Sequence, residues 1–333
     1  MKSKMKRIKI ESGSTEAVYL CTAHVLRGVV IDDAAKEVFR SQIWQAAEFH
    51  GVRILTHAIM PDHFHVLVRV PQKTDVSDAE LIRRYRVMHP KPAAQRESHL
   101  NEAIEQLKTG GPVGKAWRKQ QLGRMGDLSP FIKSVKQNFS SWYNRAHERF
   151  GTLWCGLYKS TLVEGRGDAL ALAAAYVDLS AVRAGIVSDP KEYPFCGYAA
   201  AVAGNKNARE GVMAVFGGEG GGSAGSWRVA REACRKLLYG AGGDGAVAAV
   251  TPAMLRKALE EKTTLPLAGV LRCPGRYFPE TSVLGSKEFV TKYLAAYRRV
   301  KGGTKRVVAH PLPPLADWGD VFTASGWVNR GVE

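Results

Sequence analysis

The sequence predicts an α+β fold in which strands and helices mix within one large domain, followed by a small, mainly helical C-terminal extension. Runs rich in β-branched and aromatic residues alternate with runs of helical spacing along the first 200 residues. Beyond Tyr198 the composition changes to glycine-rich sequence, which holds regular structure poorly. A length of 333 residues accommodates either two modest domains or one domain with a long extension.

The first part of the chain predicts the order strand, helix, strand, tight turn, strand. A pattern of helical spacing follows Asp32 and Asp33, either of which can cap a helix, and Gly51 can close that helix. Pro61 and Asp62 are typical turn residues. The predicted strands are residues 17–26, 52–59 and 64–70.

The middle of the chain predicts a polar, basic insertion that leads into a long helix. Ser129 is a suitable cap for this helix, with Pro130 at its first position. Trp154 follows the helix and is expected in the core. The predicted elements are a short helix at 77–88, the insertion at 90–126, the long helix at 128–149, a strand or hairpin at 151–164 and a helix at 169–186.

Four regions follow from the changes in composition along the chain. We expect a basic tail at 1–14, the main domain at 15–200, a glycine-rich linker region at 201–250 and an extension at 251–333. Helical spacing recurs in the extension at 252–262 and 287–300. The role of the extension is left open by its sequence.

The charge of the chain favours a polyanionic partner. The formal net charge is +17 and the isoelectric point is near 9.7, and nucleic acid fits this excess better than an anionic membrane, because no long amphipathic basic helix is evident. No apolar run reaches the length of a membrane span, and the N-terminus lacks the apolar stretch of a signal peptide. Five scattered cysteines form no metal-binding pair, and we expect a cytoplasmic protein.

Two histidines at the start of the third predicted strand form a candidate metal site. His63 and His65 flank Phe64, and successive side chains of a strand point to opposite faces. The two imidazoles therefore share one face while Phe64 enters a core on the other. Two neutral imidazoles aimed at one point suit a divalent cation.

Three sequence blocks resemble the single-tyrosine HUH transposases of bacterial insertion sequences, in particular the REP-associated tyrosine transposases. The first block, MPDHFHVLV, resembles the HUH motif of that family. The later blocks FGTLWCGLYKSTLVEG and YVDLSAVRAGIVSDPKEYPFCGY resemble those of the REP-associated relatives. Together the blocks span about residues 15–200, and the region after Gly204 is not covered with the same specificity.

The resemblance implies a ferredoxin-like antiparallel sheet with helices on one side, and a divalent metal, Mg²⁺ or Mn²⁺, held by His63 and His65. It further implies that a helix tyrosine attacks a phosphodiester of single-stranded DNA beside a hairpin, giving a 5′-phosphotyrosine link and then strand transfer. A tyrosine conserves the energy of the cleaved ester, so rejoining needs no nucleotide cofactor. A bacterial, nucleoid-associated location and a possible homodimer fit this reading.

The sequence departs from the family at the expected nucleophile. Phe139 occupies that slot on the long helix, and phenylalanine has no oxygen with which to attack phosphorus. Tyr143, one helical turn further on, can serve instead, with His147 another turn on as a possible third metal ligand. The alternatives are a catalytically inactive, domesticated DNA-hairpin-binding relative, another tyrosine such as Tyr158, or an error in the alignment.

Basic residues near the long helix and in the third block are candidates for phosphate contacts, which position nucleic acid without reading its sequence. A different class of function, a metal-dependent hydrolase of small substrates, is disfavoured by the charge excess and by the lack of further clustered carboxylates. The candidate DNA-binding residues are Arg83, Arg84, Arg86, Lys133, Lys136 and Arg183.

Overall fold

The structure is a computed structural model of the chain. It describes residue 8 and residues 16–71, 76–90, 94–217, 226–240, 247, 250–274, 282–301 and 307–325. Most of the predicted basic tail at 1–14 and the most glycine-rich part of the predicted linker therefore lie outside the described residues.

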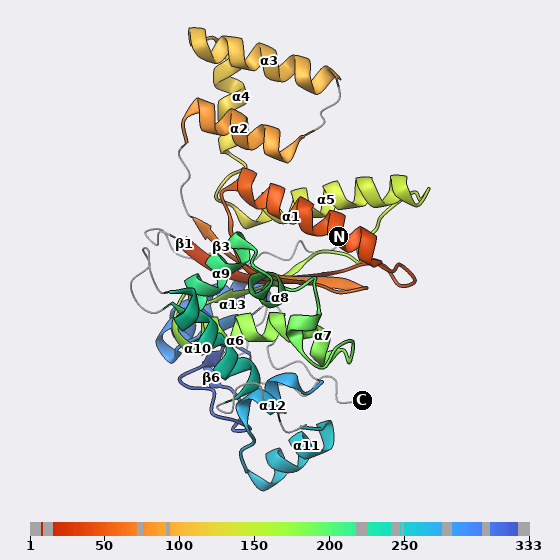
Figure 1. The fold of residues 1–333 in the computed structure, drawn as a ribbon. Helices are drawn as coiled ribbons and strands as arrows, with labels where there is room; N and C mark the ends of the chain where they lie inside the picture. The colour runs from red at the N-terminus through yellow and green to blue at the C-terminus, as the bar shows by residue number, and fades with distance from the viewer. Residues whose placement is uncertain are drawn as a thin grey trace.

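One mixed sheet of seven strands runs through the molecule, in the order β2-β3-β1-β4-β5-β7-β6, and the α+β class is confirmed (Figure 1). Strands β2, β3 and β1 pair antiparallel in that order, and β1 also pairs antiparallel with β4, whereas β4 and β5 run parallel. The strands are β1 (Glu16–His24), β2 (Arg53–Ile59), β3 (His63–Pro71), β4 (Lys159–Val163), β5 (Val283–Gly285), β6 (His310–Pro311) and β7 (Phe322–Thr323).

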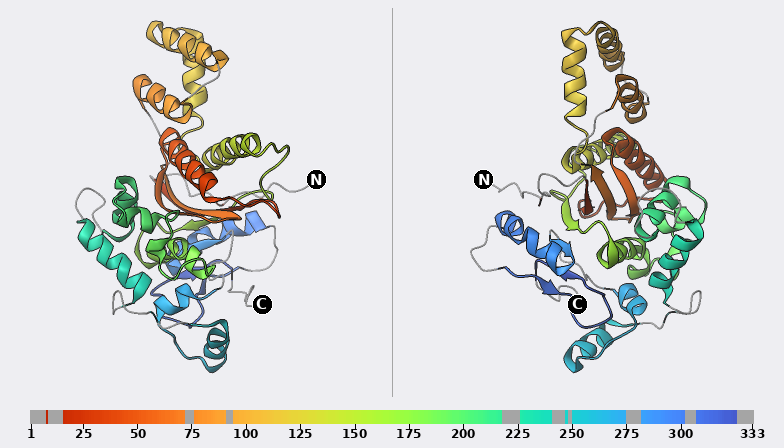
Figure 2. Two further views of the ribbon diagram at one scale, coloured as in Figure 1. Left: turned by 45° about the vertical axis from the view of Figure 1, so that its right-hand side comes forward. Right: turned by 90° about the vertical axis from the view of Figure 1, so that its left-hand side faces the viewer.

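Helices α1 (Asp33–His50) and α5 (Leu128–Ala146) lie side by side over one face of the sheet (Figure 2). Asp32 caps α1 by accepting a hydrogen bond from Ala35 N at 2.8 Å, and Gly51 ends it in the left-handed region at φ 65°. The predicted helix is confirmed at both ends. The cap of α5 is Asp127, and the prediction of Ser129 was wrong, because the Asp127 carboxylate accepts from Ser129 N at 2.7 Å.

The opposite face of the sheet is also covered, which the expected one-sided arrangement did not include. Helices α6 (Gly167–Asp178), α8 (Gly197–Val202) and α9 (Lys206–Phe216) pack there against β2 (Figure 2). Gly211 of α9 lies so close to the strand that a Cβ atom would stand 2.3 Å from the Leu55 carbonyl oxygen. Helix α9 and helix α10 (Trp227–Tyr239) occupy parts of the range predicted as a linker.

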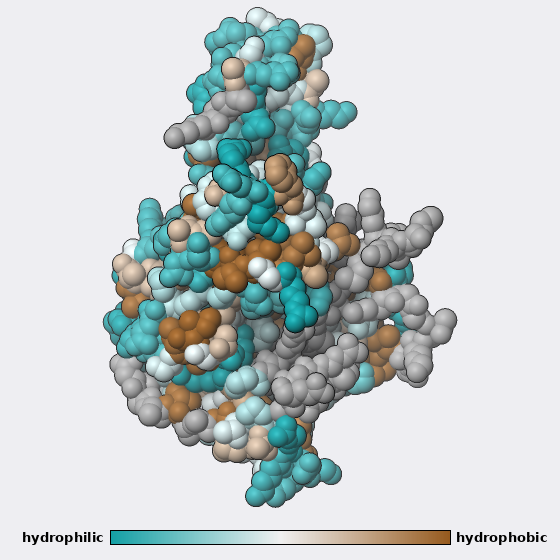
Figure 3. Space-filling view, turned by 90° about the vertical axis from the view of Figure 1, so that its right-hand side faces the viewer, coloured by the Kyte–Doolittle hydropathy of each residue, from teal (hydrophilic) through white to brown (hydrophobic). Residues whose placement is uncertain are grey.

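The predicted short helix at 77–88 and the predicted insertion at 90–126 together form a helical arm that projects from the body of the molecule (Figure 1). The arm consists of α2 (Asp78–Met88), α3 (Ala94–Thr109) and α4 (Pro112–Leu122), and α3 packs against α4. The visible surface of the arm is largely hydrophilic (Figure 3). No described helix has both the length and the apolar composition that crossing a bilayer requires.

The C-terminal region adds its own strands to the main sheet. Strand β5 pairs with β4, and the helix at Lys287–Lys301, α13, packs on β5. Strands of two or three residues are too short to show a periodic pattern, so the sequence predicted only helices here. The remaining helices are α7 (Ser180–Arg183), α11 (Pro252–Glu261), α12 (Leu267–Arg272) and α13 (Lys287–Lys301), with a 3₁₀ turn at Pro190–Glu192.

Candidate metal centre

The two histidines of β3 share one face of the sheet with residues of β1, as the alternation predicted. In the β1–β3 register, His24 lies opposite His63 and Thr22 lies opposite His65. Directly opposed residues of an antiparallel pair have their side chains on the same face. Phe64 points the other way and packs against Phe39 of α1, with ring centroids 5.1 Å apart.

Hydrogen bonds orient both imidazoles toward each other. His63 Nδ1 lies 2.6 Å from Asp62 Oδ1, and His65 Nδ1 lies 2.7 Å from Thr22 Oγ1. When these Nδ1 atoms carry the protons, they donate to the two oxygens and leave each Nε2 with an available lone pair. The two Nε2 atoms are 3.1 Å apart.

This nitrogen pair fits a divalent cation. Imidazole nitrogens bind such ions at about 2.0–2.1 Å, and two ligands at that distance and roughly at right angles stand about 3 Å apart. Metal-bound histidines also donate the other ring N–H to a carboxylate, carbonyl or similar acceptor, which fixes the tautomer. Asp62 and Thr22 occupy those supporting positions, so the residues present suit a metal bound through the Nε2 atoms of His63 and His65.

His24 and Asp62 add two further groups that could hold a metal beside the histidine pair. The ligand atoms of His24, Asp62 and His63 all lie within 4.8 Å of one another, and the rings of His24 and His63 are stacked with centroids 4.8 Å apart. The hydrogen bond from His63 lowers the pKa of the Asp62 carboxyl group below its usual value. Asp62 is therefore an ionised group at the edge of the site.

Sequence reasoning missed His24 and assigned Asp62 only to a turn. His24 stands 39 positions before His63, and only the pairing register of β1 with β3 brings the two together. A usable signal was present in the TAH sequence of the first predicted strand, where Thr22 and His24 have the same two-residue spacing as the later histidine pair.

Tyr176 of α6 packs against this histidine face. Its ring meets the His65 ring edge to face, with centroids 5.7 Å apart. The Arg183 guanidinium lies over the Tyr176 ring at 3.9 Å and donates to the Tyr176 carbonyl oxygen at 2.6 Å and to Ser180 Oγ at 3.1 Å. Arg183, predicted as a structural or phosphate-binding residue, therefore fixes the end of α6 beside the metal site.

Phe139 and Tyr143 lie in the core on the opposite side of the sheet. Phe139 has 0% exposure, and its ring packs against Phe39 and Trp154, both of which also contact Phe64. The Tyr143 hydroxyl donates to the Val30 carbonyl oxygen at 2.9 Å, and burial raises the pKa of this phenol. Because Phe64 and His65 point to opposite faces, the contacts of Phe139 belong to the face away from the two histidines.

His147 and Tyr158 are placed by other contacts. His147 is an exposed residue at the C-cap of α5, where its ring stacks on Tyr143 with centroids 4.0 Å apart. Tyr158 shares a hydrogen bond with Ser129 Oγ at 3.1 Å. Within the described part of the chain, the cluster of potential ligands at His63 includes His24 rather than His147. Trp154 is buried, as expected, and donates to the Lys136 carbonyl oxygen.

The basic residues proposed for DNA contact divide into paired and exposed ones. Arg83 pairs with Glu48 and Glu80, and Arg84 also pairs with Glu80. Lys136 donates to the Gly156 carbonyl oxygen at 2.9 Å. Arg86 and Lys133 are exposed.

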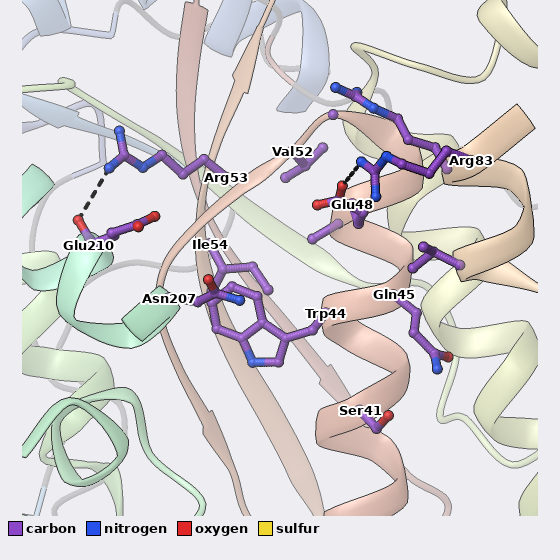
Figure 4. A pocket seen from close by; sticks show the side chains of 14 residues that line it. Ser41, Trp44, Gln45, Glu48, Val52, Arg53, Ile54, Arg83, Asn207 and Glu210 are labelled. Atoms are coloured by element: carbon purple, nitrogen blue, oxygen red, sulfur yellow. Dashed lines mark hydrogen bonds and ion pairs between the residues drawn. The ribbon is translucent and has the colours of Figure 1, made fainter. Parts of the chain in front are cut away.

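Arg83 and Arg84 line a groove rather than the histidine face. The groove, of about 760 Å³, is lined by residues of α1, α2, the edge strand β2 and α9, and Trp44 of α1 is among them (Figure 4). Arg53, at its other end, donates to the Glu210 carbonyl oxygen (Figure 4). Each of these arginines is therefore already paired with an acidic side chain or a carbonyl oxygen.

Asp178, two residues after Tyr176, anchors α6 to the sheet. Its carboxylate accepts from Thr56 Oγ1 at 2.6 Å and from Tyr198 N at 2.9 Å. Burial raises the pKa of this carboxyl group from 3.8 to about 7. The helix that carries Tyr176 is thus tied to β2 by a group that titrates near neutrality.

The raised pKa of Asp178 predicts how the stability of an Asp178→Asn variant compares with wild type. Between pH 4 and 7 the folded carboxyl group holds its proton while the unfolded one releases it, so this group's contribution to stability falls as pH rises. Asp178→Asn cannot ionise, and we expect it to gain stability relative to wild type over this range, by a few kcal/mol in all. Urea unfolding at pH 4.5, 6 and 8 measures the difference, and a constant difference would contradict the raised pKa.

Comparisons with known proteins agree with the first sequence block. Residues 17–105 match the family model described as "Transposase IS200 like", which confirms the resemblance to insertion-sequence transposases over this segment. A solved structure described as a REP-associated tyrosine transposase bound to a REP hairpin is similar at 13% identity and a TM-score of 0.37. The similarity covers 61% of this chain and 86% of that one. No curated protein matches the sequence.

Proposed function

We propose that the protein is a transposase-like DNA-binding protein that cleaves and rejoins single-stranded DNA beside hairpins, using a divalent metal and a tyrosine. The observation that carries this proposal is the pair of Nε2 atoms of His63 and His65, 3.1 Å apart and oriented by Asp62 and Thr22. The segment that contains them matches the IS200-like transposases. The net charge of +17 suits a nucleic-acid partner.

Different residues of the chain would hold the metal, orient its ligands and supply the nucleophile in such a reaction. His63 and His65 would hold Mg²⁺ or Mn²⁺, and Asp62 and Thr22 orient the two rings. When bound, the metal supplies positive charge that stabilises the phosphoryl transition state. A tyrosine hydroxyl attacks phosphorus and keeps the 5′ phosphate, and the 3′ oxygen leaves as a hydroxyl. Tyr143 is the candidate on the long helix, and its hydroxyl donates a hydrogen bond to the Val30 carbonyl oxygen.

A second candidate function is hairpin binding without cleavage. The observation in its favour is Phe139, which stands in the expected nucleophile slot and is fully buried. Such a protein would keep the fold, the metal site and the affinity for single-stranded DNA. In both functions we expect a bacterial cytoplasmic, nucleoid-associated protein, and a homodimer is one possible assembly.

The formation of a covalent adduct separates the two functions. A labelled pool of hairpin-bearing single strands with randomised flanks is incubated with the full chain and Mg²⁺ or Mn²⁺ and then denatured. A protein–DNA adduct that requires the metal supports cleavage. Tight binding of the pool without an adduct in either metal would support the binding protein instead. Failure to bind the pool at all would contradict both functions.

Salt dependence tests the basic residues. Each phosphate contact to a single strand contributes about −0.7 to the slope of log affinity against log salt. We expect Arg86→Ala and Lys133→Ala, which remove exposed charges, each to make the slope less steep by about 0.7. Arg83→Ala, which removes a charge already paired with Glu48 and Glu80, serves as the matched control with a smaller change. Fluorescence anisotropy at several salt concentrations measures these slopes, and a flat wild-type slope would contradict nucleic-acid binding.

A further inference from the structure

We propose that a cavity on the face of the sheet away from the metal centre binds a nucleobase. The cavity, of about 440 Å³, lies where α1, β2, α8 and the start of α9 meet, and its lining includes Trp44, His57 and Asn205. Its volume falls within the range of small-molecule sites. The inference goes beyond the proposed function, because base binding here requires neither a metal nor cleavage.

His57 lies on the face of β2 that points away from the metal-binding nitrogens. In the β2–β3 register, Ala58 lies opposite His65, and His57 lies opposite Val66. Directly opposed residues share a face and successive residues alternate, so His57 faces the layer that contains α1. Trp44 of α1 meets the His57 ring edge to face, with centroids 6.1 Å apart. The cavity is therefore separate from the metal centre.

His57 is the buried polar side chain of the cavity. It is 1% exposed, and within the described part of the chain neither of its ring nitrogens has a hydrogen-bond partner. Most buried polar groups do have a partner, because a buried group without one is costly. Burial, and to a lesser extent the charge of Arg40, lower the pKa of His57 to about 4, so the ring is neutral at pH 7. A neutral imidazole offers one donor and one acceptor to a ligand.

The cavity runs inward from the surface to His57. Ser41, Ala203 and Asn205 are exposed at its rim, whereas His57 and Ala208 are buried. Asn205 is fixed there because its Oδ1 accepts a hydrogen bond from Ala208 N at 2.9 Å. Asn205 and Ala208 lie beyond the three sequence blocks, so the family resemblance does not cover this wall of the cavity. A ligand that enters from the surface therefore approaches the imidazole.

The charges around the cavity favour an uncharged ligand. Arg40 pairs with Glu37 and donates to the Pro194 carbonyl oxygen at 3.2 Å, so its charge is already balanced. The neutral His57 ring adds no charge of its own. A purely apolar ligand would leave the two ring nitrogens unpaired. The cavity therefore suits a neutral molecule that carries both a hydrogen-bond donor and an acceptor.

A nucleobase combines these properties. Each base is planar and carries donors or acceptors on its edges, and aromatic side chains bind its ring by stacking. Trp44 lines both the cavity and the adjoining groove, so a base in the cavity can leave its sugar in the groove (Figure 4). The net charge of +17 already favours a nucleic-acid partner. The base can belong to an unpaired nucleotide of a bound strand or to a free nucleoside, since both offer the same chemistry.

Free nucleosides and a single strand distinguish these two sources. Adenosine, guanosine, cytidine and thymidine are titrated without metal into the full chain labelled with ¹⁵N-histidine, and an unstructured single strand and its abasic counterpart are titrated in parallel. We expect the ring nitrogen resonances of His57, assigned with His57→Phe, to shift with at least one base-bearing ligand. A shift with a nucleoside identifies a site for free ligands. A shift with the strand alone, absent with the abasic strand, identifies a site for a base of a bound strand.

Two variants test the cavity in different ways. His57→Phe removes both ring nitrogens, and we expect about a 10-fold or greater loss of base affinity. Its free energy of unfolding should equal or exceed that of wild type, because an unpaired buried polar group is removed. Ala203→Leu narrows the rim from an exposed position and should weaken base binding to a similar extent with His57 intact. Gln42→Ala, on the same helix as Trp44 but outside the lining of the cavity and the groove, is the matched control.

Titration calorimetry measures the affinities, and urea unfolding measures the stabilities. Unshifted His57 resonances with every nucleoside and with the strand would overturn the inference, and would indicate that water alone satisfies the imidazole. Wild-type base affinity in both His57→Phe and Ala203→Leu would also overturn it. If His57→Phe fails to fold, Ala203→Leu decides alone. A protein that binds a base here but forms no covalent adduct with DNA would support this inference and contradict the proposed cleavage.

Discussion

His65→Ala is expected to weaken Mn²⁺ binding by at least about 100-fold and to abolish any metal-dependent reaction with DNA. Supporting residues of metal sites typically affect affinity 10- to 100-fold, and a direct ligand has a larger effect. His65 is 7% exposed and its Nε2 lies 3.1 Å from that of His63, so no solvent-exposed group can readily replace it. We expect His63→Ala to weaken Mn²⁺ binding to a similar extent. Electron paramagnetic resonance of free Mn²⁺ measures the affinity.

Four further variants, one of them a control, test how the site is built. His99→Ala removes an exposed histidine from the distant helical arm and is the matched control, with wild-type affinity expected. Thr22→Val removes the oxygen that orients His65 Nδ1 and should weaken binding about 10-fold or more. His24→Ala should weaken binding and His147→Ala should not. Wild-type Mn²⁺ affinity in His65→Ala would refute the candidate metal centre.

The histidine pair could be predicted from sequence because its geometry is local. A strand alternates its side chains strictly, so the spacing of His63 and His65 fixes their common face before any pairing is known. Their partners could not be predicted in the same way. His24 and Thr22 join the site through the register of β1 against β3, which depends on long-range packing of both strands.

The periodicity of α5 correctly predicted which of its residues share a face, but not where that face lies in the molecule. Phe139 and Tyr143 share one face of the helix, as their four-residue spacing predicts. That spacing does not reveal which side of a sheet the helix covers. Both faces of the central strands are buried, so the burial pattern of β3 offered no distinction either. The side of the sheet that α5 covers is determined by its packing against α1, which is distant from it in the sequence.

Phe139→Tyr is expected to destabilise the protein by about 1–3 kcal/mol and to create no nucleophile. The substitution places a tyrosine at the position where the family resemblance led us to expect the nucleophile. Phe139 has 0% exposure, and aromatic rings surround it, with Phe39 at 4.3 Å and Trp154 at 6.0 Å between centroids. A hydroxyl buried there without a hydrogen-bond partner costs about 1–3 kcal/mol, and the added oxygen also crowds a filled core.

Urea unfolding and the adduct assay together decide what Phe139 does. Phe139→Ala, which leaves a cavity, should cost about 3–5 kcal/mol and shows how much the ring contributes to the core. Phe139→Tyr should form no more adduct than wild type, because its ring belongs to the layer beyond Phe64, away from the Nε2 pair. If Phe139→Tyr keeps wild-type stability and gains a metal-dependent adduct on residue 139, then α5 reaches the metal during the reaction. In that case the chain is an inactivated relative one substitution from cleavage.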